Sequence, residues 1–375
     1  MLYLKHFPPK GPVNDGTSTA VDGLASGLAE NGAKVTVLCE GPERKSVRNG
    51  RGYGVECFAN PKPFRTFALS PELESYIANQ TAGQRSLCLI NGMFNPPVYA
   101  MARCLRKHGV PYVMVPHDPY DPVVFRRNPH LKWPYWYLFE RRLLRQARAI
   151  QVMDERHGAW LPGLGVDTHV IHAENGIAPA SVPAEEELTW RSLDEPARLM
   201  FLGRIDAYNK GLDTLLDAFA LVALRVDARL TLQGPDWGDR ARLEKRAAGQ
   251  TGAAWIKFLP PDYEKASPRL IAEHDLFCLP SRFEGFGLAA LEAMLAGRVL
   301  LVSERAGIAR HIEASDCGVT VEPTTAGVTR GLLTLLERRA EWREMGLAGR
   351  RYALANLQWK SIAADALAEY ERLVA

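Results

Sequence analysis

One stretch of the sequence, residues 276–296, predicts a strand, a glycine-rich loop and a helix in immediate succession. Leu276–Leu279 is a short apolar run, typical of a strand that is buried on both faces of a parallel sheet. Leucines then recur at helical spacing between Gly287 and Gly297, so we expect a helix there. The loop 282–287 lies between them. Its glycines let a ligand approach the backbone, and the helix start offers N–H groups to an anion.

Two glutamates lie in this stretch, Glu284 on the loop and Glu292 inside the helix. Carboxylates accept hydrogen bonds from neighbouring hydroxyls, so the pair suits a ligand that carries sugars and phosphate. With the glycines between them, the two residues resemble the signature of the retaining GT-B glycosyltransferases of family 4, the group 1 glycosyl transferases. The resemblance implies that Glu284 binds hydroxyls of the donor sugar and that Glu292 binds the ribose of the nucleotide. The donor site that it implies also includes Gly285, Phe286, Gly287 and Leu288.

Two other interpretations of this stretch remain open. One is an ordinary glycine-rich turn followed by a helix with a solvated glutamate. The other is dinucleotide binding, because Gly285-x-Gly287-x-x-Ala290 matches G-x-G-x-x-A and Glu304 follows at the end of the next strand. Against dinucleotide binding, Pro280 precedes Gly285 by five positions, which is too loose for the tight first turn of that fingerprint.

The length and composition indicate a two-domain globular protein. A chain of 375 residues exceeds the usual size of a single core, and 47% of the residues are hydrophobic and 24% charged. No apolar run is long enough to span a bilayer, and the first residues do not form a signal peptide. Six scattered cysteines without metal-type spacing are typical of reduced core residues. We therefore expect a cytoplasmic protein.

The net charge is +3, and the excess of basic residues lies within the first 180 positions. The segment 125–148 is basic and aromatic, and we predict a helix with Pro134 in its first turn and with Tyr135, Leu138 and Arg142 on one face. Such a helix packs on the core with a solvated basic face, or it contacts an anionic acceptor or the membrane surface. Trp133 is a candidate acceptor contact. The remaining sequence has no basic track for nucleic acid.

The first half of the chain alternates strands and helices. A strand at 2–5, a loop and a helix through Val21, Leu24 and Leu28 lead to a strand at 35–38, which makes a βαβ unit. This loop resembles the glycine loop that faces the donor phosphates in the family, and only Gly16 carries over. Asn14 beside it is a candidate acceptor contact. Four further strands are expected in this half, at 87–90, 112–115, 149–153 and 169–172.

His117 and Asp118 directly follow the predicted strand 112–115. A side chain at the carboxyl end of a parallel strand points into the crevice where open α/β sheets bind ligands. The family has a histidine at this place that contacts the transferred sugar, so the resemblance makes His117 a catalytic candidate and Asp118 an acceptor contact. The alternative is a histidine with a purely structural role.

The second half begins with a strand at 198–202, followed by Gly203 and Arg204, then Lys210 and Gly211 at the start of a helix. An arginine fork and a lysine can together neutralise a diphosphate. The pair strongly resembles the Gly-Arg and Lys-Gly motif whose cations hold the donor pyrophosphate in the family. The spacing is one residue longer than the commonest form.

Strands are also expected at 230–232, 255–259 and 299–302, and a last helix at 359–373. In the family, the loop after the strand 255–259 flanks the nucleotide base, which makes Leu259 a donor contact. We expect an N-terminal domain at 1–180, a linker at 181–196 and a C-terminal domain at 197–357. The resemblance implies that the helix within 358–375 returns to the first domain.

The predicted fold is therefore α/β of the GT-B type, with two Rossmann-like domains whose parallel sheets face each other across a central cleft. The predicted activity is retaining transfer of a hexose from a nucleotide-diphosphate sugar, UDP- or GDP-linked, to a hydroxyl acceptor that is a glycan, lipid-linked or a small molecule. No Asp-x-Asp occurs, so Arg204 and Lys210 would replace a metal, and no cofactor is expected. The predicted catalytic residues are His117, Arg204, Lys210 and Glu284.

Three other functions remain open at this point. One is a nucleotide-sugar hydrolase or epimerase on the same scaffold, for which His117 or Asp118 would position water. The second is an NAD-dependent oxidoreductase that binds the dinucleotide at Gly285 and Gly287. The third is a sugar-binding scaffold without catalytic activity.

Overall fold

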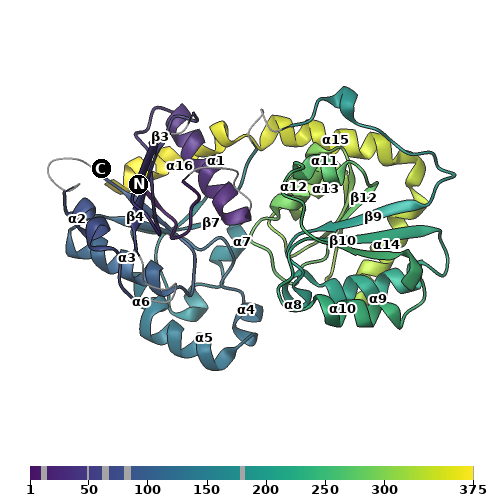
Figure 1. Cartoon of the computed structure of the whole chain (residues 1–375), viewed down its shortest axis with the longest axis horizontal. Coiled ribbons are helices and arrows are strands. Elements are labelled where there is room, and N and C mark those ends of the chain that lie inside the picture. The colour runs from purple at the N-terminus through teal and green to yellow at the C-terminus, as the bar shows by residue number, and fades with distance from the viewer. Residues whose placement is uncertain (10–14, 49, 61–66, 80–85, 178–181, 375) are drawn as a thin grey trace. The chain divides into compact units, whose positions relative to one another are not determined.

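The structure is a computed structural model that describes residues 1–9, 15–48, 50–60, 67–79, 86–177 and 182–374. The chain divides into two compact units. Unit 1 holds Met1–Gly176 and Trp359–Ala375, and unit 2 holds Ile177–Gln358. Each unit is built on one largely parallel sheet with helices on both faces (Figure 1).

The sheet of unit 1 has the strand order β3-β4-β2-β1-β5-β6-β7-β8. The described strands pair in parallel, apart from β3, which is antiparallel to β4. The order reverses beside β1, because the chain first adds β2 on one side and later β5 on the other. The strands are β1 (Leu2–Tyr3), β2 (Thr36–Gly41), β3 (Lys45–Arg48), β4 (Gly54–Ala59), β5 (Cys88–Asn91), β6 (Tyr112–Val115), β7 (Ala149–Val152) and β8 (Val170–His172).

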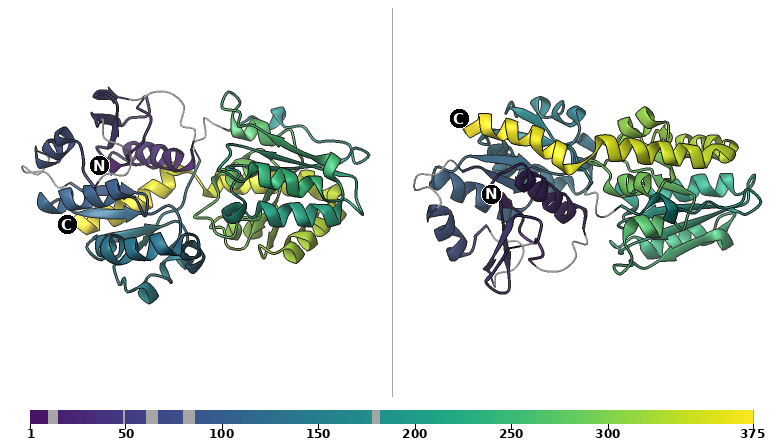
Figure 2. Two further views of the ribbon diagram at one scale, coloured as in Figure 1. Left: turned by 60° about the horizontal axis from the view of Figure 1, so that its bottom comes forward. Right: turned by 90° about the horizontal axis from the view of Figure 1, so that it is seen from above.

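Helices cover both faces of this sheet. A core of buried side chains such as Tyr3, Ile90, Met101 and Leu143 joins one face of the sheet to α2, α3 and α6. The helices α1 and α16 pack together on the other face (Figure 2). The helices of unit 1 are α1 (Gly16–Glu30), α2 (Pro71–Asn79), α3 (Pro96–Lys107), α4 (Pro122–Arg126), α5 (Pro129–Tyr135), the π-helix η1 (Trp136–Glu140), α6 (Arg141–Arg145), α7 (Glu155–Gly158), the 3-10 helix η2 (Pro162–Leu164) and α16 (Trp359–Val374).

The last helix, α16, belongs to unit 1 although it is far from the rest of that unit in sequence. It lies so close to α1 that a Cβ added at Gly27 would be 2.6 Å from the carbonyl oxygen of Trp359. The side chain of Asn31, at the end of α1, donates a 2.8 Å hydrogen bond to the carbonyl oxygen of Lys360. At the other end of α16, the hydroxyl of Tyr370 donates to Gln151 in β7. These contacts fasten the C-terminal helix to unit 1.

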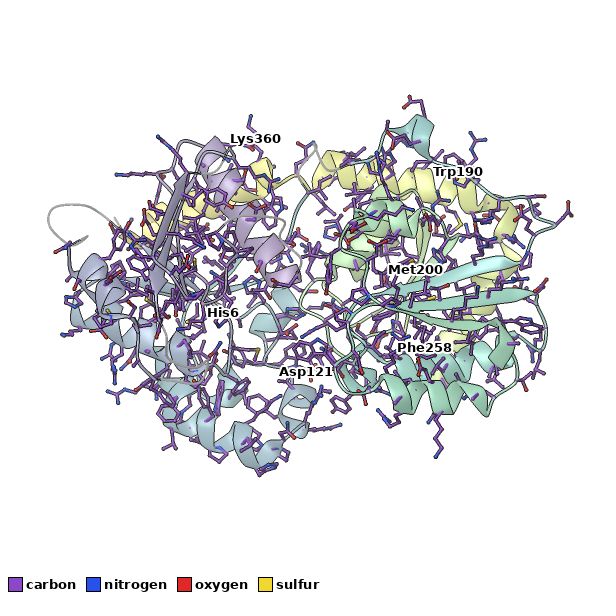
Figure 3. The ribbon with its side chains drawn as sticks, viewed as in Figure 1. His6, Asp121, Trp190, Met200, Phe258 and Lys360 are labelled. Carbon is purple, nitrogen blue, oxygen red and sulfur yellow. The ribbon has the colours of Figure 1, made fainter. Side chains whose placement is uncertain are left out.

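The sheet of unit 2 has six parallel strands in the order β11-β10-β9-β12-β13-β14. Its order reverses between β9 and β12. The central strands are buried, and Met200 of β9 (labelled in Figure 3) and Phe277 of β12 are inaccessible to solvent. The strands are β9 (Ala197–Leu202), β10 (Ala228–Gln233), β11 (Ile256–Leu259), β12 (Leu276–Leu279), β13 (Val299–Ser303) and β14 (Gly318–Val321).

In unit 2, α9, α10 and α14 pack together on one face of the sheet, and α11, α12, α13 and α15 on the other (Figure 1). The helices are α8 (Ala207–Lys210), α9 (Leu212–Val222), α10 (Arg240–Ala248), α11 (Ser267–Ile271), α12 (Leu288–Leu295), α13 (Ala309–Ser315), α14 (Thr325–Glu337) and α15 (Trp342–Asn356). The 3-10 helices are η4 (Glu185–Glu187), η5 (Ala253–Trp255) and η6 (Arg339–Glu341).

The described part of the predicted linker, residues 182–196, is held on the surface of unit 2. The guanidinium groups of Arg298 and Arg343 lie 5.6 and 4.9 Å from the ring centre of Trp190 (Figure 3). Arg350 in α15 donates to the carbonyl oxygen of Pro183, and Arg339 donates to that of Leu193 at 3.2 Å. Several arginines of unit 2 therefore fix the position of this segment.

The prediction of a helix with Pro134 in its first turn is wrong. The segment 125–148 is divided into α4, α5, η1 and α6, and Pro134 lies inside α5 instead of in a first turn. The π-helical stretch η1 adds residues per turn, so the side chains that follow no longer keep the spacing of an α-helix. As a result Trp136 is buried, whereas Tyr137 and Leu138 are 59% and 64% exposed. Leu138 therefore does not face the core.

Candidate functional site

The loops that follow β9 and β12 meet in unit 2, because these neighbouring strands flank the point where the strand order reverses. Ligands of open α/β sheets bind at the carboxyl ends of the strands at such a point. The two loops pack closely. Gly211 has a φ of 64°, and a Cβ on it would be 2.3 Å from the carbonyl oxygen of Pro280. A side chain at position 211 would force the loops apart.

Lys210 and Glu284, 74 positions apart in sequence, form an ion pair at this junction. The Nζ of Lys210 lies 2.5 Å from Oε2 of Glu284, and the two side chains are only 11% and 14% exposed. The hydroxyl of Ser281 donates a second hydrogen bond, of 3.0 Å, to the same oxygen. The structure thus brings together two of the predicted catalytic residues and holds them in a partly desolvated place, where charges interact strongly.

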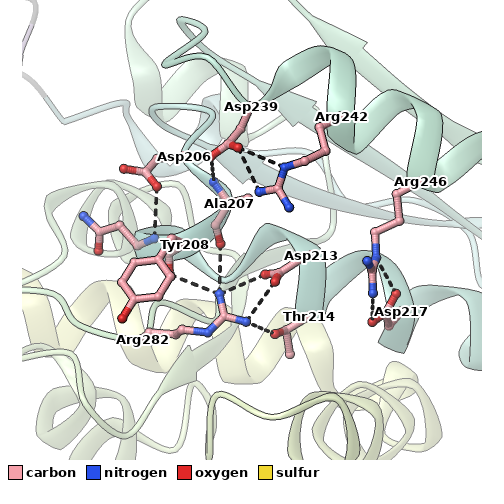
Figure 4. A network of polar contacts seen from close by, with 11 residues as sticks. Asp206, Ala207, Tyr208, Asp213, Thr214, Asp217, Asp239, Arg242, Arg246 and Arg282 are labelled. Carbon is pink, nitrogen blue, oxygen red and sulfur yellow. Dashed lines mark hydrogen bonds and ion pairs between the residues drawn. The ribbon is translucent and has the colours of Figure 1, made fainter. Parts of the chain in front are cut away.

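Arg282 joins the two loops. Its guanidinium forms paired 2.9 and 3.0 Å hydrogen bonds with the carboxylate of Asp213 and a 2.9 Å bond with the hydroxyl of Thr214 (Figure 4). It also donates to the carbonyl oxygens of Ala207 and Tyr208 at 3.0 and 3.1 Å. Because Arg282 precedes Glu284 by two residues and these partners lie on both sides of Lys210, the guanidinium fixes the place of one member of the ion pair relative to the other.

Arg204 also lies at the carboxyl ends of the strands, in the loop that follows β9. Its guanidinium is 4.6 Å from the ring centre of Trp237, in the loop after β10. Gly203 and Gly234 allow these loops to touch, since a Cβ on Gly234 would be 1.9 Å from the carbonyl oxygen of Gly203. Within the described residues, no carboxylate lies within ion-pair distance of Arg204. Its charge is therefore available to an anionic ligand.

The loop 284–287 ends at Gly287, which precedes the first residue of α12, Leu288, and has a φ of 108°. A Cβ at Gly287 would be 3.0 Å from Leu279 and 3.2 Å from Ile308. The ring of Phe286 is buried in the core. Its carbonyl oxygen accepts a 2.9 Å hydrogen bond from Ile308 N.

The neighbouring loop, after β13, lies against the same backbone. A Cβ on Gly307 would be 2.5 Å from the carbonyl oxygen of Gly285. A ligand that approaches this part of the loop therefore meets main-chain atoms and the start of a helix, which together suit a phosphate or a hydroxyl.

Glu292 lies in the second turn of α12 and is partly buried. Burial raises its pKa to about 7, and a hydrogen bond from Ser267 opposes that rise. A carboxylate that is short of partners in a desolvated place can accept hydrogen bonds from hydroxyls of a ligand. Leu259, which ends β11, is 38% exposed, and its carbonyl oxygen accepts a hydrogen bond from Gly234 N at 3.3 Å.

In unit 1, His117 follows β6 with a φ of 67°, a strained conformation for a histidine. Its Nε2 lies 2.8 Å from Oδ1 of Asn91, at the end of the adjacent strand β5. The amide nitrogen of Asn91 donates to the carbonyl oxygen of Tyr3, so Oδ1 faces the ring and His117 donates through Nε2. Burial lowers the pKa of His117 to about 4, against the opposing charge of Asp15, so the imidazole is neutral near pH 7.

Glu140 explains how the strained loops around His117 are held. It is inaccessible to solvent, and its Oε1 accepts hydrogen bonds from the hydroxyl of Tyr120 at 2.7 Å and from Phe94 N at 3.1 Å. Tyr120 lies in the loop after β6, and Phe94, with a φ of 49°, lies in the loop after β5. Burial raises the pKa of Glu140 to about 7, against these two hydrogen bonds.

The other predicted contacts of unit 1 lie on different elements of the chain. Gly16 is the first residue of α1, whose N-terminus is capped by Asp15 through a 2.9 Å hydrogen bond from Ser18 N. Asp118 lines a small cavity together with His117. Trp133 stacks on Phe125 with 4.4 Å between ring centres. Asn14 lies outside the described residues.

Sequence reasoning missed the residues that arrange the site. Asn91, Glu140, Trp237 and Ser281 were not singled out, and Arg282 was named only as part of a loop. The sequence holds one usable signal for Arg282, its position two residues before Glu284 in a loop that also contains the glycines. The described residues contain no group of three or more His, Cys, Asp or Glu placed to hold a metal ion. Over the same part of the chain, no helix has the length and apolar character needed to cross a membrane.

Two family models match this chain, one in each half. Residues 196–338 match the family model of the group 1 glycosyl transferases, and residues 15–176 match that of the glycosyl transferase 4-like domain. An MMP alpha-(1->4)-mannosyltransferase of Mycolicibacterium hassiacum is 28% identical over 96% of this chain and 95% of its own length. A phosphatidyl-myo-inositol mannosyltransferase of Mycobacterium tuberculosis is 30% identical over 46% of each chain.

Solved structures show the same fold. A sucrose-phosphate synthase of Thermosynechococcus elongatus superposes with a TM-score of 0.78 at 18% identity, over 99% of this chain and 98% of its own. A glycosyltransferase involved in lipopolysaccharide biosynthesis superposes with a TM-score of 0.69 at 18% identity, over 97% of both chains. The predicted fold is thus confirmed, and the family matches favour a transferase over an oxidoreductase. This chain is a glycosyltransferase of GT-B fold and belongs to the group 1 family.

Proposed function

We propose that this glycosyltransferase moves a hexose from a nucleotide-diphosphate sugar, UDP- or GDP-linked, to a hydroxyl acceptor, with retention and without a metal ion. The observation that carries the proposal is the Lys210–Glu284 pair, with Arg204 on the same edge of the sheet. Cations beside a sugar-binding carboxylate suit a ligand that has a diphosphate next to a sugar. The relatives named above include two mannosyltransferases, so GDP-mannose is the first donor to test.

The roles of the donor-site residues follow from their chemistry. Arg204 and Lys210 neutralise the diphosphate as it leaves, and preorganised charges of this kind stabilise a transition state. Glu284 accepts hydrogen bonds from sugar hydroxyls, and Glu292 accepts them from the ribose. The main chain of residues 285–288 faces the donor, and Leu259 lies beside the base.

In unit 1, we assign Gly16 to the donor phosphates and His117 to the transferred sugar. The Nε2 of His117 is engaged with Asn91, so Nδ1 is the ring atom that meets a sugar hydroxyl. A neutral imidazole can accept a hydrogen bond there. Asn14, Asp118 and Trp133 are assigned to the acceptor.

The test of the diphosphate assignment is the loss of turnover in Arg204→Ala and Lys210→Ala. We expect each to lower kcat by roughly two to three orders of magnitude, the size seen when one preorganised charge is lost. Lys245→Ala, which removes an exposed lysine from α10, is the matched control. The unfolding temperature of each variant is measured beside kcat, because Lys210→Ala leaves the largely desolvated Glu284 without its cation and should lower stability, whereas the surface change Lys245→Ala should not. Near-normal turnover in both site variants would contradict the assignment.

The segment 125–148 supports a second element of the proposal, contact with an anionic membrane surface from the cytoplasmic side. Leu131, Tyr137 and Leu138 are exposed there. Tyr137 also lines a surface hollow, together with Arg141, Arg142, Arg145 and Gln146. Exposed apolar side chains next to arginines bind the interface of anionic bilayers.

Sedimentation with vesicles tests the membrane contact. Vesicles of pure phosphatidylcholine should leave the protein in solution, and vesicles with phosphatidylglycerol should sediment it. The variant in which Arg141, Arg142 and Arg145 are changed to Gln should lose that binding. The membrane contact would be contradicted if the protein bound both vesicle types equally. It would also be contradicted if the parent protein and the triple Gln variant bound the phosphatidylglycerol vesicles equally.

A further inference from the structure

Trp237 is an exposed aromatic residue beside the candidate donor site. It lies in the loop between β10 and α10, and 55% of it is accessible to solvent. The guanidinium of Arg204 lies over its ring, 4.6 Å from the centre. An arginine at this distance is attracted by the negative face of the indole.

The loop that carries Trp237 is fixed to the main chain around Arg204. Ile205 N donates a 2.9 Å hydrogen bond to the carbonyl oxygen of Pro235, and Trp237 N donates a 3.3 Å bond back to the carbonyl oxygen of Ile205. These bonds flank Arg204 on its C-terminal side. The close approach of Gly203 and Gly234 fixes the loops on the other side.

The turn after Trp237 is equally constrained. The Oδ1 of Asp236 accepts hydrogen bonds of 2.8, 3.1 and 3.1 Å from the main-chain N–H groups of Gly238, Asp239 and Arg240. Asp239 in turn accepts a 2.8 Å bond from Ala207 N (Figure 4). The main chain at Trp237 therefore cannot move relative to Arg204 without breaking several hydrogen bonds.

Among the described residues, the guanidinium of Arg204 contacts the ring of Trp237 and forms no ion pair with a carboxylate. An arginine side chain with no fixed partner loses rotamer entropy when a ligand orders it. An arginine held over a ring has lost part of that freedom before the ligand arrives. This contact uses none of the guanidinium N–H groups in an ion pair, so they stay free to bind phosphate oxygens.

We propose that Trp237 is a positioning residue that holds the guanidinium of Arg204 ready for the diphosphate of the donor. This inference rests on the proposed function, because it requires that Arg204 binds the diphosphate. It adds that the arginine is preorganised by an aromatic ring of the next loop. Two other roles for the exposed indole are direct stacking on the ligand and support of the loop, and each gives a different result below.

The test is a double-mutant cycle on kcat/KM for the donor, with Trp237→Ala and Arg204→Ala made singly and together. Cation–π contacts at exposed sites imply that Trp237→Ala lowers kcat/KM by about two- to fivefold. Trp237→Phe, which keeps an aromatic face, should recover most of the loss. In the Arg204→Ala background, Trp237→Ala should change nothing further. Calorimetric titration with UDP and GDP should show the same pattern in the dissociation constant.

Trp255→Ala is the matched control, since Trp255 is also an exposed tryptophan of unit 2 but precedes β11, at the opposite edge of the sheet. It should leave kcat/KM unchanged. If Trp237→Ala lowers kcat/KM by the same factor with and without Arg204, the indole contacts the ligand directly and positioning is refuted. If Trp237→Ala lowers the unfolding temperature and Trp237→Phe recovers none of the lost kcat/KM, the indole supports the loop. That result would also refute the positioning role.

The failure of the proposed function gives a separate signature. If Arg204→Ala alone retains full activity, the diphosphate assignment fails, and the positioning role fails with it. If Arg204→Ala is strongly impaired and Trp237→Ala is not, only the positioning role fails.

Discussion

The change Glu292→Gln is expected to stabilise the ligand-free protein at high pH. Burial raises the pKa of Glu292 to about 7 from an ordinary value of 4.5. Below pH 4.5, the carboxyl group is protonated in both the folded and the unfolded chain and has no effect. Between pH 4.5 and 7, the unfolded chain releases the proton first, so the free energy of unfolding falls as the pH rises. Above pH 7, the full cost of an ionised, desolvated carboxylate is present.

The size of this effect follows from the two pKa values. Each pKa unit corresponds to roughly 1.4 kcal/mol, and Glu292 keeps some contact with solvent, so the cost at pH 8 is about 2–3 kcal/mol. Glutamine has nearly the same shape and carries no charge at any of these pH values. We therefore expect Glu292→Gln to equal the parent protein at pH 4.5 and to exceed its stability by about 2–3 kcal/mol at pH 8.

The assay is urea unfolding of parent and variant at several pH values from 4.5 to 8, followed by tryptophan fluorescence. The quantity to compare is the difference between the two proteins at each pH, because other groups that titrate cancel in it. Glu337→Gln, which changes an exposed glutamate of α14, is the control and should show no such trend. Parallel stability profiles for the parent protein and Glu292→Gln would refute the burial argument.

Two further predictions concern the mechanism. Activity should survive excess EDTA, because the cations of Arg204 and Lys210 take the place of a metal; complete loss on chelation, restored by magnesium or manganese, would contradict this. Arg282→Lys keeps the charge but cannot form the forked bonds to Asp213, so the Lys210–Glu284 pair should shift and kcat should fall by roughly 10- to 100-fold. The donor KM of a folded Arg282→Lys protein is measured beside kcat, and an unchanged kcat would show that Arg282 does not position the pair.

Most of the strands could be predicted because strands of a parallel sheet are buried on both faces and form continuous apolar runs. The bounds predicted for β6 and β12 agree with the structure. The sequence analysis does not predict the edge strands β3 and β14, nor β4, which lies beside β3. Their burial is partial, so polar residues interrupt the apolar signal, as in Lys45–Arg48.

The helices around Pro134 could not be predicted, because the spacing of Tyr135, Leu138 and Arg142 fits an ordinary α-helix. A π-helical stretch depends on what the inserted residues contact. Here η1 places Glu140 beneath the loops that carry Phe94 and Tyr120. Those partners lie 46 and 20 positions away in sequence, so no local sequence pattern predicts these contacts.

The site was partly predictable for the same reason. A loop motif on each of β9 and β12 identified Lys210 and Glu284, but only the strand order shows that these two loops are neighbours. The supporting residues are less visible. Arg282 contacts Asp213, Arg204 contacts Trp237 and His117 contacts Asn91, and each contact joins residues distant in sequence. Their side chains are ordinary for loops and strand ends.

The division of labour between Glu284 and Glu292 is the central claim, and titration calorimetry tests it most directly. The nucleotide sugar and the free nucleoside diphosphate are each titrated into Glu284→Gln and Glu292→Gln, above pH 7 so that Glu292 is ionised. Gln removes charge-assisted hydrogen bonds of roughly 1.5–3 kcal/mol in each case. We expect Glu284→Gln to damage sugar transfer and leave the affinity for the free nucleoside diphosphate nearly intact. Glu292→Gln should weaken both ligands by similar factors. Equal weakening of the free nucleotide by the two variants would contradict the account.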